Sequence, residues 1–486
     1  MESVKMQKRG SSPMSSPRKK RKHLVSTLNK HYKSINKLDD YRQLYISDSR
    51  MDIFVWGTGS MCELGLGPLA KNKEVKRPRL NPLLQREKAG IVSFAVGGMH
   101  CLALDSDNNV WSWGTNDSGA LGRDTSGAAE QLRDMDAAES SDDEDGDLNE
   151  LEATPTMLPR DSLPLDTQKV VQLAATDNLS CVLFENGDVY AWGTFRCNEG
   201  ILGFYQDAIE SQRSPWKLPS FSGSRIVQMA PGKDHILFLD EHGVVYAWGN
   251  GQQYQLGRKI MERSRLRTLD PRAFGLDGVK YIASGENHSF ALADDGRLFA
   301  WGLNQFGQCG ISNEVEDGAM VTVPTEVLLP PDVKVESIAA GEHHSIVLTQ
   351  DGDLYTFGRL DMFEVGISAE DYPESTYKDV HGKARSVPVP TKLKGLPKFK
   401  AIAAGSHHSL AVARNGIIYS WGFGETYAVG LGPAGEDVEV PTRIKNTATQ
   451  HESIVFVGCG GQFSVAGGIE LSDEEAEKRA KEMGDE

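Results

Sequence analysis

The sequence predicts an all-β protein, a seven-bladed β-propeller of four-stranded blades that spans residues 51–469. Three observations lead to this fold class. A short phrase with Gly-x-x-His at its start and Trp-Gly at its end recurs along the chain, its internal spacing is constant, and the first and last copies are each incomplete in complementary ways. Repetition at a fixed period is the signature of repeat architectures such as propellers.

Each copy of the phrase predicts a β-hairpin. The clearest copy, GENHSFALADDGRLFAWG at 285–302, has two alternating apolar runs on either side of an Asp-Asp-Gly turn, which is typical of a hairpin. The step from the His position to the aromatic is 13 residues in every copy, although Leu179 replaces His in one of them. The pairs are His100 and Trp113, Leu179 and Trp192, His235 and Trp248, His288 and Trp301, His344 and Phe357, and His408 and Trp421.

The two ends of the repeated region complement each other. Trp56-Gly57 has no hairpin partner before it, and GGQFSV at 460–465 has no Trp-Gly after it. We therefore expect the N-terminal and C-terminal strands to pair in one blade, which closes the ring and removes its free sheet edges.

The fourth strand of each blade is predicted from proline. Between the hairpins, each connecting segment has a Pro followed within three residues by an apolar side chain, and proline is tolerated at a sheet edge rather than in a central strand. These pairs are Pro78/Leu80, Pro155/Met157, Pro215/Leu218, Pro271/Phe274, Pro324/Val327, Pro390/Leu393 and Pro441/Ile444.

The Trp, Gly and His residues that recur at constant spacing are expected to have structural roles. We expect the Trp side chains to pack between blades, the Gly residues to permit tight turns, and the His residues to be buried hydrogen-bonding groups rather than catalysts. The six cysteines are scattered and no His/Cys cluster has zinc spacing, so no metal or cofactor is predicted. The longest apolar runs fall short of about 18 residues, so no membrane span is expected.

Charge divides the chain into an acidic body and a basic arm. The net charge is −16, but residues 1–50 carry +9 and the remainder −25. Residues 1–50 are predicted to be a flexible arm that meets nucleic acid or a nuclear import receptor, and residues 470–486 an acidic, helix-prone tail. Within the arm a basic run reads as a nuclear localisation signal or a DNA-phosphate patch: Arg18, Lys19, Lys20, Arg21 and Lys22.

Two segments are longer than the repeat requires. A dense acidic insert at about 130–152 is predicted to be disordered, because such a run cannot bury itself. A further insertion at 372–386 is predicted to be a surface loop that could face a partner.

A third departure is the stretch WGTFRCNEGILG at 192–203. Six other copies place an apolar-Gly step nine residues after the aromatic, whereas here the step takes eleven. The two extra residues predict a longer loop on one face of the propeller, with a turn at Asn198-Glu199-Gly200. From spacing alone, a neutral surface insertion explains it at least as well as a functional one.

Taken together, these motifs resemble the regulator of chromosome condensation family. The segments that carry the resemblance are GGMH (97–100), GALGRDTS (119–126), WGTFRCNEGILG (192–203), GKDH (232–235), QLGR (255–258) and GEHH (341–344). The resemblance covers about residues 51–469 and implies guanine nucleotide exchange on the small GTPase Ran, in the nucleus and on chromatin, with roles in nucleocytoplasmic transport and mitosis. Such an exchange factor performs no covalent chemistry, so no enzyme activity in that sense is expected.

The resemblance also assigns residues. It implies a β-wedge that enters the GTPase and destabilises nucleotide and Mg²⁺ binding, made of Phe195, Arg196, Cys197, Asn198, Glu199, Gly200, Ile201 and Leu202. It implies exchange contacts by Asp234 first, then Asp177, His343, His100 and Arg258. Chromatin contacts with nucleosome histones and DNA are implied for Arg263 and Arg265 and for the basic arm. Ser60 and Phe463 depart from the family pattern, so no role is carried over to them.

One alternative of a different class stays open at the level of sequence. A propeller can be an interaction scaffold or a chromatin reader without exchange activity, because this fold serves many functions. The long segment at 195–202, with Asp234 in the following repeat, is the feature that favours exchange.

Overall fold

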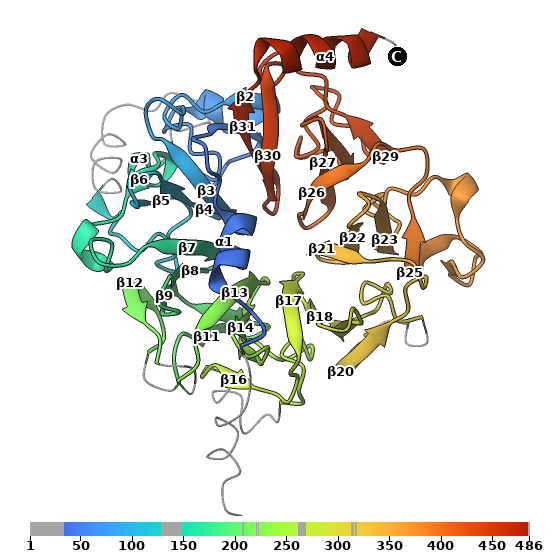
Figure 1. The fold of residues 1–486 in the computed structure, drawn as a ribbon, viewed down its shortest axis with the longest axis horizontal. Coiled ribbons are helices and arrows are strands. Elements are labelled where there is room, and N and C mark those ends of the chain that lie inside the picture. Colours follow the sequence, from blue (N-terminus) through green and yellow to red (C-terminus); the bar gives the residue numbers. More distant parts are fainter. Residues whose placement is uncertain are drawn as a thin grey trace, which may run out of the picture. The chain divides into compact units, whose positions relative to one another are not determined.

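The computed structural model describes residues 34–127, 148–206, 209–219, 221, 223–260, 269–312, 315 and 318–484. Residues 35–484 of these ranges form a ring of seven antiparallel sheets, six with four strands and one with five, and each sheet runs from the centre of the ring outward (Figure 1). The predicted seven-bladed propeller of four-stranded blades is confirmed.

The blades follow one another along the chain after the closing blade, here called blade 1. Blade 1 contains β30 (Glu452–Cys459), β31 (Phe463–Glu470), β1 (Asp52–Thr58) and β2 (Glu74–Leu80). Blade 2 contains β3 (Ile91–Val96), β4 (His100–Asp105), β5 (Val110–Gly114) and β6 (Thr156–Met157). Blade 3 contains β7 (Val170–Ala175), β8 (Leu179–Phe184), β9 (Val189–Gly193) and β12 (Gln212–Lys217).

Blade 4 contains β13 (Ile226–Pro231), β14 (His235–Asp240), β15 (Val245–Gly249) and β16 (Arg272–Ala273). Blade 5 contains β17 (Val279–Ser284), β18 (His288–Ala293), β19 (Leu298–Leu303) and β20 (Met320–Val327). Blade 6 contains β21 (Val335–Ala340), β22 (His344–Thr349), β23 (Leu354–Arg359) and β25 (Ala384–Lys392), to which β24 (Tyr377–Lys378) adds a fifth strand. Blade 7 contains β26 (Phe399–Ala404), β27 (His408–Ala413), β28 (Ile418–Gly422) and β29 (Val438–Arg443).

Closure of the ring occurs in blade 1, as the unmatched ends predict. Strand β1 pairs with β31, with Trp56 opposite Ser464 and Phe54 opposite Ala466. Arg86 fastens this junction, because its guanidinium contacts Asp52 on β1 at 2.8 Å, Glu452 on β30, and Glu470 on β31 at 3.4 Å. The three carboxylates thus come from the two chain ends that the blade joins.

A repeated polar relay joins neighbouring blades. In five of the seven seams, a buried His Nε2 lies 2.8–2.9 Å from a Ser Oγ of the next blade, and that Ser donates to a backbone carbonyl in the loop of the blade that carries the His. The pairs are His100–Ser180, His235–Ser289, His288–Ser345, His344–Ser409 and His408–Ser464. The recurring His residues are therefore core hydrogen-bonding groups, as expected.

The other two seams are apolar. Leu179 of blade 3 and Ile236 of blade 4 occupy the His and Ser positions and share one buried cluster, and Phe463 of blade 1 does the same with Cys101 of blade 2. Both members change together, so neither seam leaves a buried His or Ser without its partner. This accounts for the departure at Phe463 and for Leu179.

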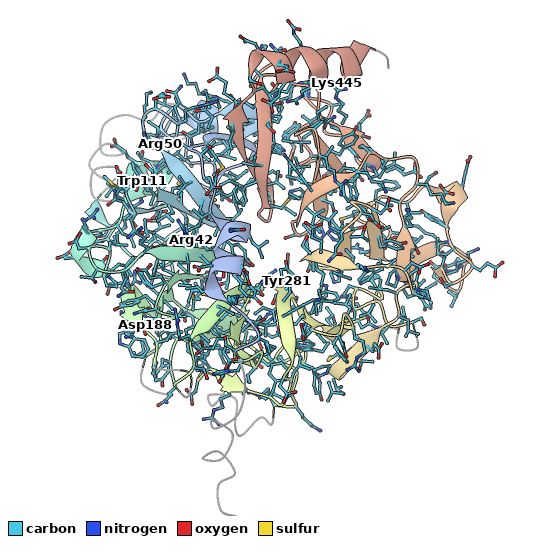
Figure 2. The ribbon with its side chains drawn as sticks, viewed as in Figure 1. Arg42, Arg50, Trp111, Asp188, Tyr281 and Lys445 are labelled. Carbon is cyan, nitrogen blue, oxygen red and sulfur yellow. The ribbon has the colours of Figure 1, made fainter. Side chains whose placement is uncertain are left out.

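The segment before β1 is not a free arm. Helix α1 (Leu38–Tyr45) lies over the inner strands at the centre of the ring (Figure 1), and Figure 2 shows Tyr281 of β17 near the same opening. Asn36 donates to the carbonyls of Asp240 and Val279 at 3.1 and 3.0 Å, Tyr41 is 7% exposed, and the Tyr45 hydroxyl accepts from Gln228. The predicted flexible arm of residues 1–50 is therefore corrected: residues 35–50 belong to the ring.

The acidic insert and the C-terminal tail are also ordered in part. Helix α3 (Glu150–Ala153) is capped by Asn149, whose side chain accepts from the Leu151 amide, and Glu152 accepts from the Thr125 hydroxyl at 2.9 Å. Residues 148–152 thus lie outside any disordered insert, while 128–147 fall outside the described residues. In the tail, α4 (Asp473–Gly484) is capped by Ser472 and fastened by Arg479, which donates to the Glu452 carbonyl at 2.6 Å.

Candidate functional site

One face of the ring gathers the predicted site residues. In each blade the turn before the His position and the end of the Trp-Gly strand lie side by side, as in blade 4, where His235 pairs with Gly249. The GKDH turn and the WGTFRCNEGILG segment therefore reach the same face. The hairpin turns such as Asn415-Gly416, and helix α1, lie at the opposite ends of the strands.

The eleven-residue step forms a separate two-stranded hairpin. Strand β10 (Phe195–Cys197) pairs with β11 (Gly200–Gly203), and this ribbon belongs to no blade. Asn198 and Glu199 make the turn, and Gly200 follows with φ +120°, a backbone conformation that favours glycine. The predicted turn is confirmed. Arg196, Asn198, Glu199 and Ile201 are exposed, so the tip of the hairpin is available to a partner.

Apolar side chains hold the base of the hairpin. Phe195 is 0% exposed and meets Trp248 edge-on, with ring centroids 4.7 Å apart, while Leu202 is 6% exposed. These two members of the predicted wedge are therefore anchors within the blade 3–4 seam, and the exposed residues between them form the projecting part. Phe204 also contacts Trp248, at 5.3 Å.

The extra residues change the seam beneath them. Five other Trp indoles donate to a backbone carbonyl in the loop of the preceding blade, at 2.7–2.9 Å. The Trp248 indole has no such partner among the described residues. This seam is also one of the two apolar ones, through Leu179 and Ile236. The hairpin therefore sits on a hydrophobic seam filled by Phe195 and Phe204 in place of the polar relay.

Asp234 lies directly behind the hairpin. Its Oδ1 accepts from the Arg196 backbone amide at 2.8 Å, which ties the GKDH turn of blade 4 to the first strand of the hairpin. Burial raises the pKa of Asp234 to about 6, although the Arg196 amide and the Lys233 ammonium oppose that rise. The carboxylate is thus ionised at neutral pH, half-buried, and poorly solvated.

Asp177 belongs to a second group of charges, which lines a pocket formed by the turns that precede the His positions. Its carboxylate lies against Gly98, and burial, with the nearby Glu286 carboxylate, raises the pKa of Asp177 to about 7. The Lys233 ammonium lies 2.9 Å from Glu286, and Glu286 also accepts from the Ser406 hydroxyl at 2.5 Å. Lys233 and Glu286 were missed from the sequence, because they occupy variable positions of the Gly-x-x-His turn.

The structure treats the other three predicted exchange contacts differently. His343 is on this face, where its Nε2 meets Gln305 Nε2 at 2.9 Å, and burial lowers its pKa to about 3, so the ring is neutral. His100 is fully buried in the blade 2–3 seam, and burial lowers its pKa to about 4; its prediction as a surface contact is corrected to a structural role. Arg258 is half-buried and donates to the Arg272 carbonyl at the outer strand of blade 4, away from the hairpin's own contacts.

A polar cavity of about 410 Å³ opens between the hairpin and blades 2–5. It is lined by carboxylates and by two cations, among them Asp117, Asp177, Asp234, Arg196 and Lys233. The cavity brings Asp177 and Asp234 together with the hairpin. Among the described residues no group of three or more His, Cys, Asp or Glu side chains is arranged to hold a metal ion.

Gln252 and Asn250 are further residues that sequence reasoning missed. Asn250 Nδ2 donates to the Arg196 carbonyl at 3.2 Å, and Gln252 contacts both residues of the hairpin turn. They come from the WGNGQQYQLG segment of blade 4 (248–257), which has the ordinary spacing of the repeat and so gives no signal at these two positions. Arg263, Arg265 and the basic run Arg18–Lys22 lie outside the described residues.

No helix within the described part of the chain has the length and apolar character to cross a membrane. The model of a family described as the RCC1-like domain matches residues 52–466. The guanine nucleotide exchange factor SRM1 of Saccharomyces cerevisiae is 71% identical over 467 residues, which cover 95% of this chain and 97% of that protein.

Two solved structures are similar over nearly their whole length. One is Prp20p from Saccharomyces cerevisiae, described with its binding properties to Gsp1p and histones; it has a TM-score of 0.88 and 69% identity, and the match covers 94% of this chain and all of that one. The other is yeast RCC1 (Prp20) with Kap60 bound, with a TM-score of 0.88 and 66% identity, over 99% of this chain and all of that one.

Proposed function

The chain belongs to the family of proteins built on an RCC1-like domain, and on that premise we propose that it is a guanine nucleotide exchange factor for the small GTPase Ran. The single observation that carries the proposal is the hairpin β10–β11. It is separate from the blades and lies beside Asp234 in a ring whose repeats otherwise keep a constant spacing. The 71% identity to a protein named as a guanine nucleotide exchange factor supports the same activity.

In the proposed mechanism, the exposed tip of the hairpin enters the GTPase next to its nucleotide. Asp234 and Asp177, held in a poorly solvated cavity, offer carboxylates to basic groups that otherwise bind the nucleotide phosphates. Each tenfold gain in release rate requires ~1.4 kcal/mol of selective stabilisation of the release transition state. Several decades of acceleration therefore need a whole face, to which His343 and Arg258 would also contribute.

Exchange of this kind makes and breaks no covalent bond, so we propose that the protein acts only by binding. It stabilises a GTPase state that holds nucleotide and Mg²⁺ weakly, and it speeds release of GDP and GTP alike. The direction of exchange then follows from which nucleotide is more abundant. No cofactor enters this mechanism.

We further propose a nuclear, chromatin-associated protein. The basic run Arg18–Lys22 would be read by a nuclear import receptor and would contact DNA phosphates, and Arg263 and Arg265 would contact nucleosome histones through bidentate pairing with carboxylates. The binding of Prp20p to histones and of Kap60 to yeast RCC1 supports both partners. Roles in nucleocytoplasmic transport and mitosis follow from localised exchange.

A propeller scaffold or chromatin reader without exchange activity is the remaining candidate. A scaffold uses its faces for docking and has no need of a hairpin separate from the blades, nor of half-buried carboxylates with raised pKa values beside it. The hairpin therefore favours exchange over scaffolding.

The experiment is release of fluorescently labelled GDP from Ran. Purified full-length protein, at substoichiometric concentration, is expected to accelerate release and to act in repeated cycles. A variant in which residues 196–201 are replaced by a two-residue turn serves as the control, and it is expected to keep its melting temperature and lose exchange. Release that equals the intrinsic rate of Ran would leave the scaffold as the better description.

A further inference from the structure

The β10–β11 hairpin is too short to hold its own conformation. It has three residues in one strand and four in the other, and an isolated two-stranded ribbon is at best marginally stable in water. Its pairing is also irregular, with a register shift between Phe195 and Arg196. A tip that must enter a partner needs outside support if it is to be held in one geometry.

The outside support is graded along the hairpin. The base is held by Phe195 and Leu202 in the apolar seam, and the middle by Asp234 and Asn250, which bond to the amide and the carbonyl of Arg196. The tip is held by Gln252, whose Oε1 accepts from the Asn198 amide at 3.0 Å. The Gln252 Nε2 donates to the Glu199 carboxylate oxygens at 3.2 and 3.1 Å.

Gln252 is itself held in place by its own loop. Its backbone amide donates to Asn250 Oδ1 at 2.9 Å, and Asn250 also bonds to Arg196. Both residues of the hairpin turn therefore connect through one side chain to the strand end of blade 4, the blade that carries Asp234. An amide side chain suits this position because one end accepts from a backbone N–H and the other donates to a carboxylate.

We propose that Gln252 is a positioning residue for exchange: by bonding to Asn198 and Glu199 it fixes the tip of the hairpin in the geometry that enters the GTPase. This inference rests on the proposed function. In this proposal, a residue of blade 4 keeps the tip of the hairpin ordered, and that tip is the part that contacts the GTPase. A loose tip is competent for only part of the time, and that fraction reduces the apparent affinity and rate.

Three variants separate this role from a general effect on the fold. Gln252→Ala removes both contacts. Gln252→Glu keeps the acceptor for the Asn198 amide but places a second carboxylate against Glu199. The double variant Gln252→Glu/Glu199→Gln restores a hydrogen-bonding amide–carboxylate pair between positions 252 and 199, with the two residue types exchanged. Glu425→Ala is the matched control, because Glu425 is the fourth residue after Trp421, as Gln252 is after Trp248, and it is exposed.

We expect Gln252→Ala and Gln252→Glu to lower kcat/KM for nucleotide release roughly tenfold, the scale set by one or two solvent-exposed hydrogen bonds. The melting temperature should stay unchanged, since these contacts lie at the surface. The penalty of Gln252→Glu, measured against its own background, should disappear when Glu199→Gln is present, as a double-mutant cycle requires. Glu425→Ala should exchange like the unaltered protein.

Amide hydrogen exchange in the free protein provides a readout that does not depend on GTPase activity. The peptide containing Asn198 should exchange faster in Gln252→Ala and return to the original rate in the double variant. Faster amide exchange together with no nucleotide exchange by the unaltered protein would reject the proposed function while keeping the anchoring. An unchanged kcat/KM in Gln252→Ala, an equal loss without rescue, or a melting temperature that falls with activity would overturn the positioning role.

Discussion

At the scale of single residues, Asp234 combines two properties that usually conflict. It is buried enough to raise its pKa to about 6, yet it is kept as an acceptor for the Arg196 amide. A carboxylate in that state has lost part of its hydration before any partner arrives, so it gains more from meeting a cation than an exposed one does. Its backbone acceptor role and its charge can be separated by substitution.

We expect Asp234→Asn to slow nucleotide release about tenfold and Asp234→Ala to slow it further, since the amide retains an acceptor for Arg196 and alanine does not. Neither substitution should lower the melting temperature at pH 7.5, because the raised pKa means that the charged form is the disfavoured one in the fold. Stopped-flow GDP release and differential scanning fluorimetry measure the two effects. An Asp234→Asn variant as active as the unaltered protein would remove the charge from the mechanism.

The same pKa predicts how exchange depends on pH. Asp234 gains a proton as the pH falls through about 6, so exchange by the unaltered protein should decline between pH 7 and 5.5. The ratio of its rate to that of Asp234→Asn isolates this group, because any titration of the GTPase affects both. The ratio should approach one at the acid end of the range. A ratio that stays constant would assign the decline to other groups.

At the scale of elements, the N-terminal strap (residues 35–50) joins blades that lie apart in sequence. Asn36 bonds to the turn of blade 4 and to the first residue of β17, Tyr41 to the Lys280 carbonyl, and the Ser47 amide donates to Val92 of blade 2. It also meets the far end of β14, the strand that begins next to Asp234. The strap is therefore part of the ring that supports the hairpin, on the opposite face.

Deletion of residues 1–33 should leave both the melting temperature and exchange in solution unchanged, because the contacts that the strap makes with the described part of the ring are retained. Deletion of residues 1–50 should lower the melting temperature by several degrees, since Tyr41 loses a burial worth ~1.5–3 kcal/mol and Asn36 loses two buried hydrogen bonds. Thermal unfolding of the two truncated proteins makes the comparison. Equal melting temperatures would show that the strap adds nothing to the ring.

The difference between the predicted and observed elements has a physical cause. The seven hairpins, the proline-marked outer strands and the closure were predictable, because each repeats a local pattern that needs no knowledge of distant contacts. The strap was not, since its eight-residue helix has charged residues at Asp39, Asp40 and Arg42 and buries only Tyr41. Residues 148–152 were assigned to the acidic insert for the same reason: the Thr125 contact that orders Glu152 is 27 residues away.

The site was predictable in outline for a related reason. The eleven-residue step predicts the position of the hairpin, since two extra residues between two fixed points of a repeat must lengthen the loop between them. The spacing of the repeats does not show that Phe195 and Leu202 point inward or that His100 lies in a seam. It also does not show that Gln252 bonds to the hairpin turn. Those facts depend on which blade packs next to which side chain. One signal was present: Leu179 broke the His pattern in the same repeat that carries the extra residues, and the seam beneath the hairpin is indeed apolar.

At the scale of the whole molecule, the ring buries both histidines and carboxyl groups, and burial shifts their pKa values in opposite directions. Burial lowers the pKa of His100 to about 4 and those of His235, His288 and His408 to about 3, and it also lowers the pKa of His344 well below its usual range. Burial also raises the pKa values of Glu63, Glu364, Glu452 and Asp177 to about 7. The histidines resist protonation in the fold, whereas the carboxyl groups favour it.

These two sets predict a stability profile with two regimes. Between about pH 6.5 and 4.5 the unfolded chain protonates its histidines, which favours unfolding, while the folded ring protonates its buried carboxyl groups, which favours folding, so the free energy of unfolding should change little. Below about pH 4.5 the same carboxyl groups also bind protons in the unfolded chain, so their protonation no longer offsets that of the histidines. The seam histidines stay neutral in the fold down to pH 3–4, so the free energy of unfolding should fall steeply there, by roughly 1.4 kcal/mol per pH unit for each histidine.

Denaturant unfolding at pH 7, 6, 5, 4.5, 4 and 3.5 tests this profile. A His288→Gln variant provides the internal comparison, since glutamine does not titrate and, among the described residues, the His288 ring meets the Ser345 hydroxyl at 2.8 Å. The variant should be less stable than the unaltered protein at pH 7 and should lose less stability on going from pH 4.5 to 3.5. Parallel curves for the two proteins over that range would mean that the seam histidines do not drive acid unfolding, and a linear decline from pH 6.5 would mean that the buried carboxyl groups do not compensate them.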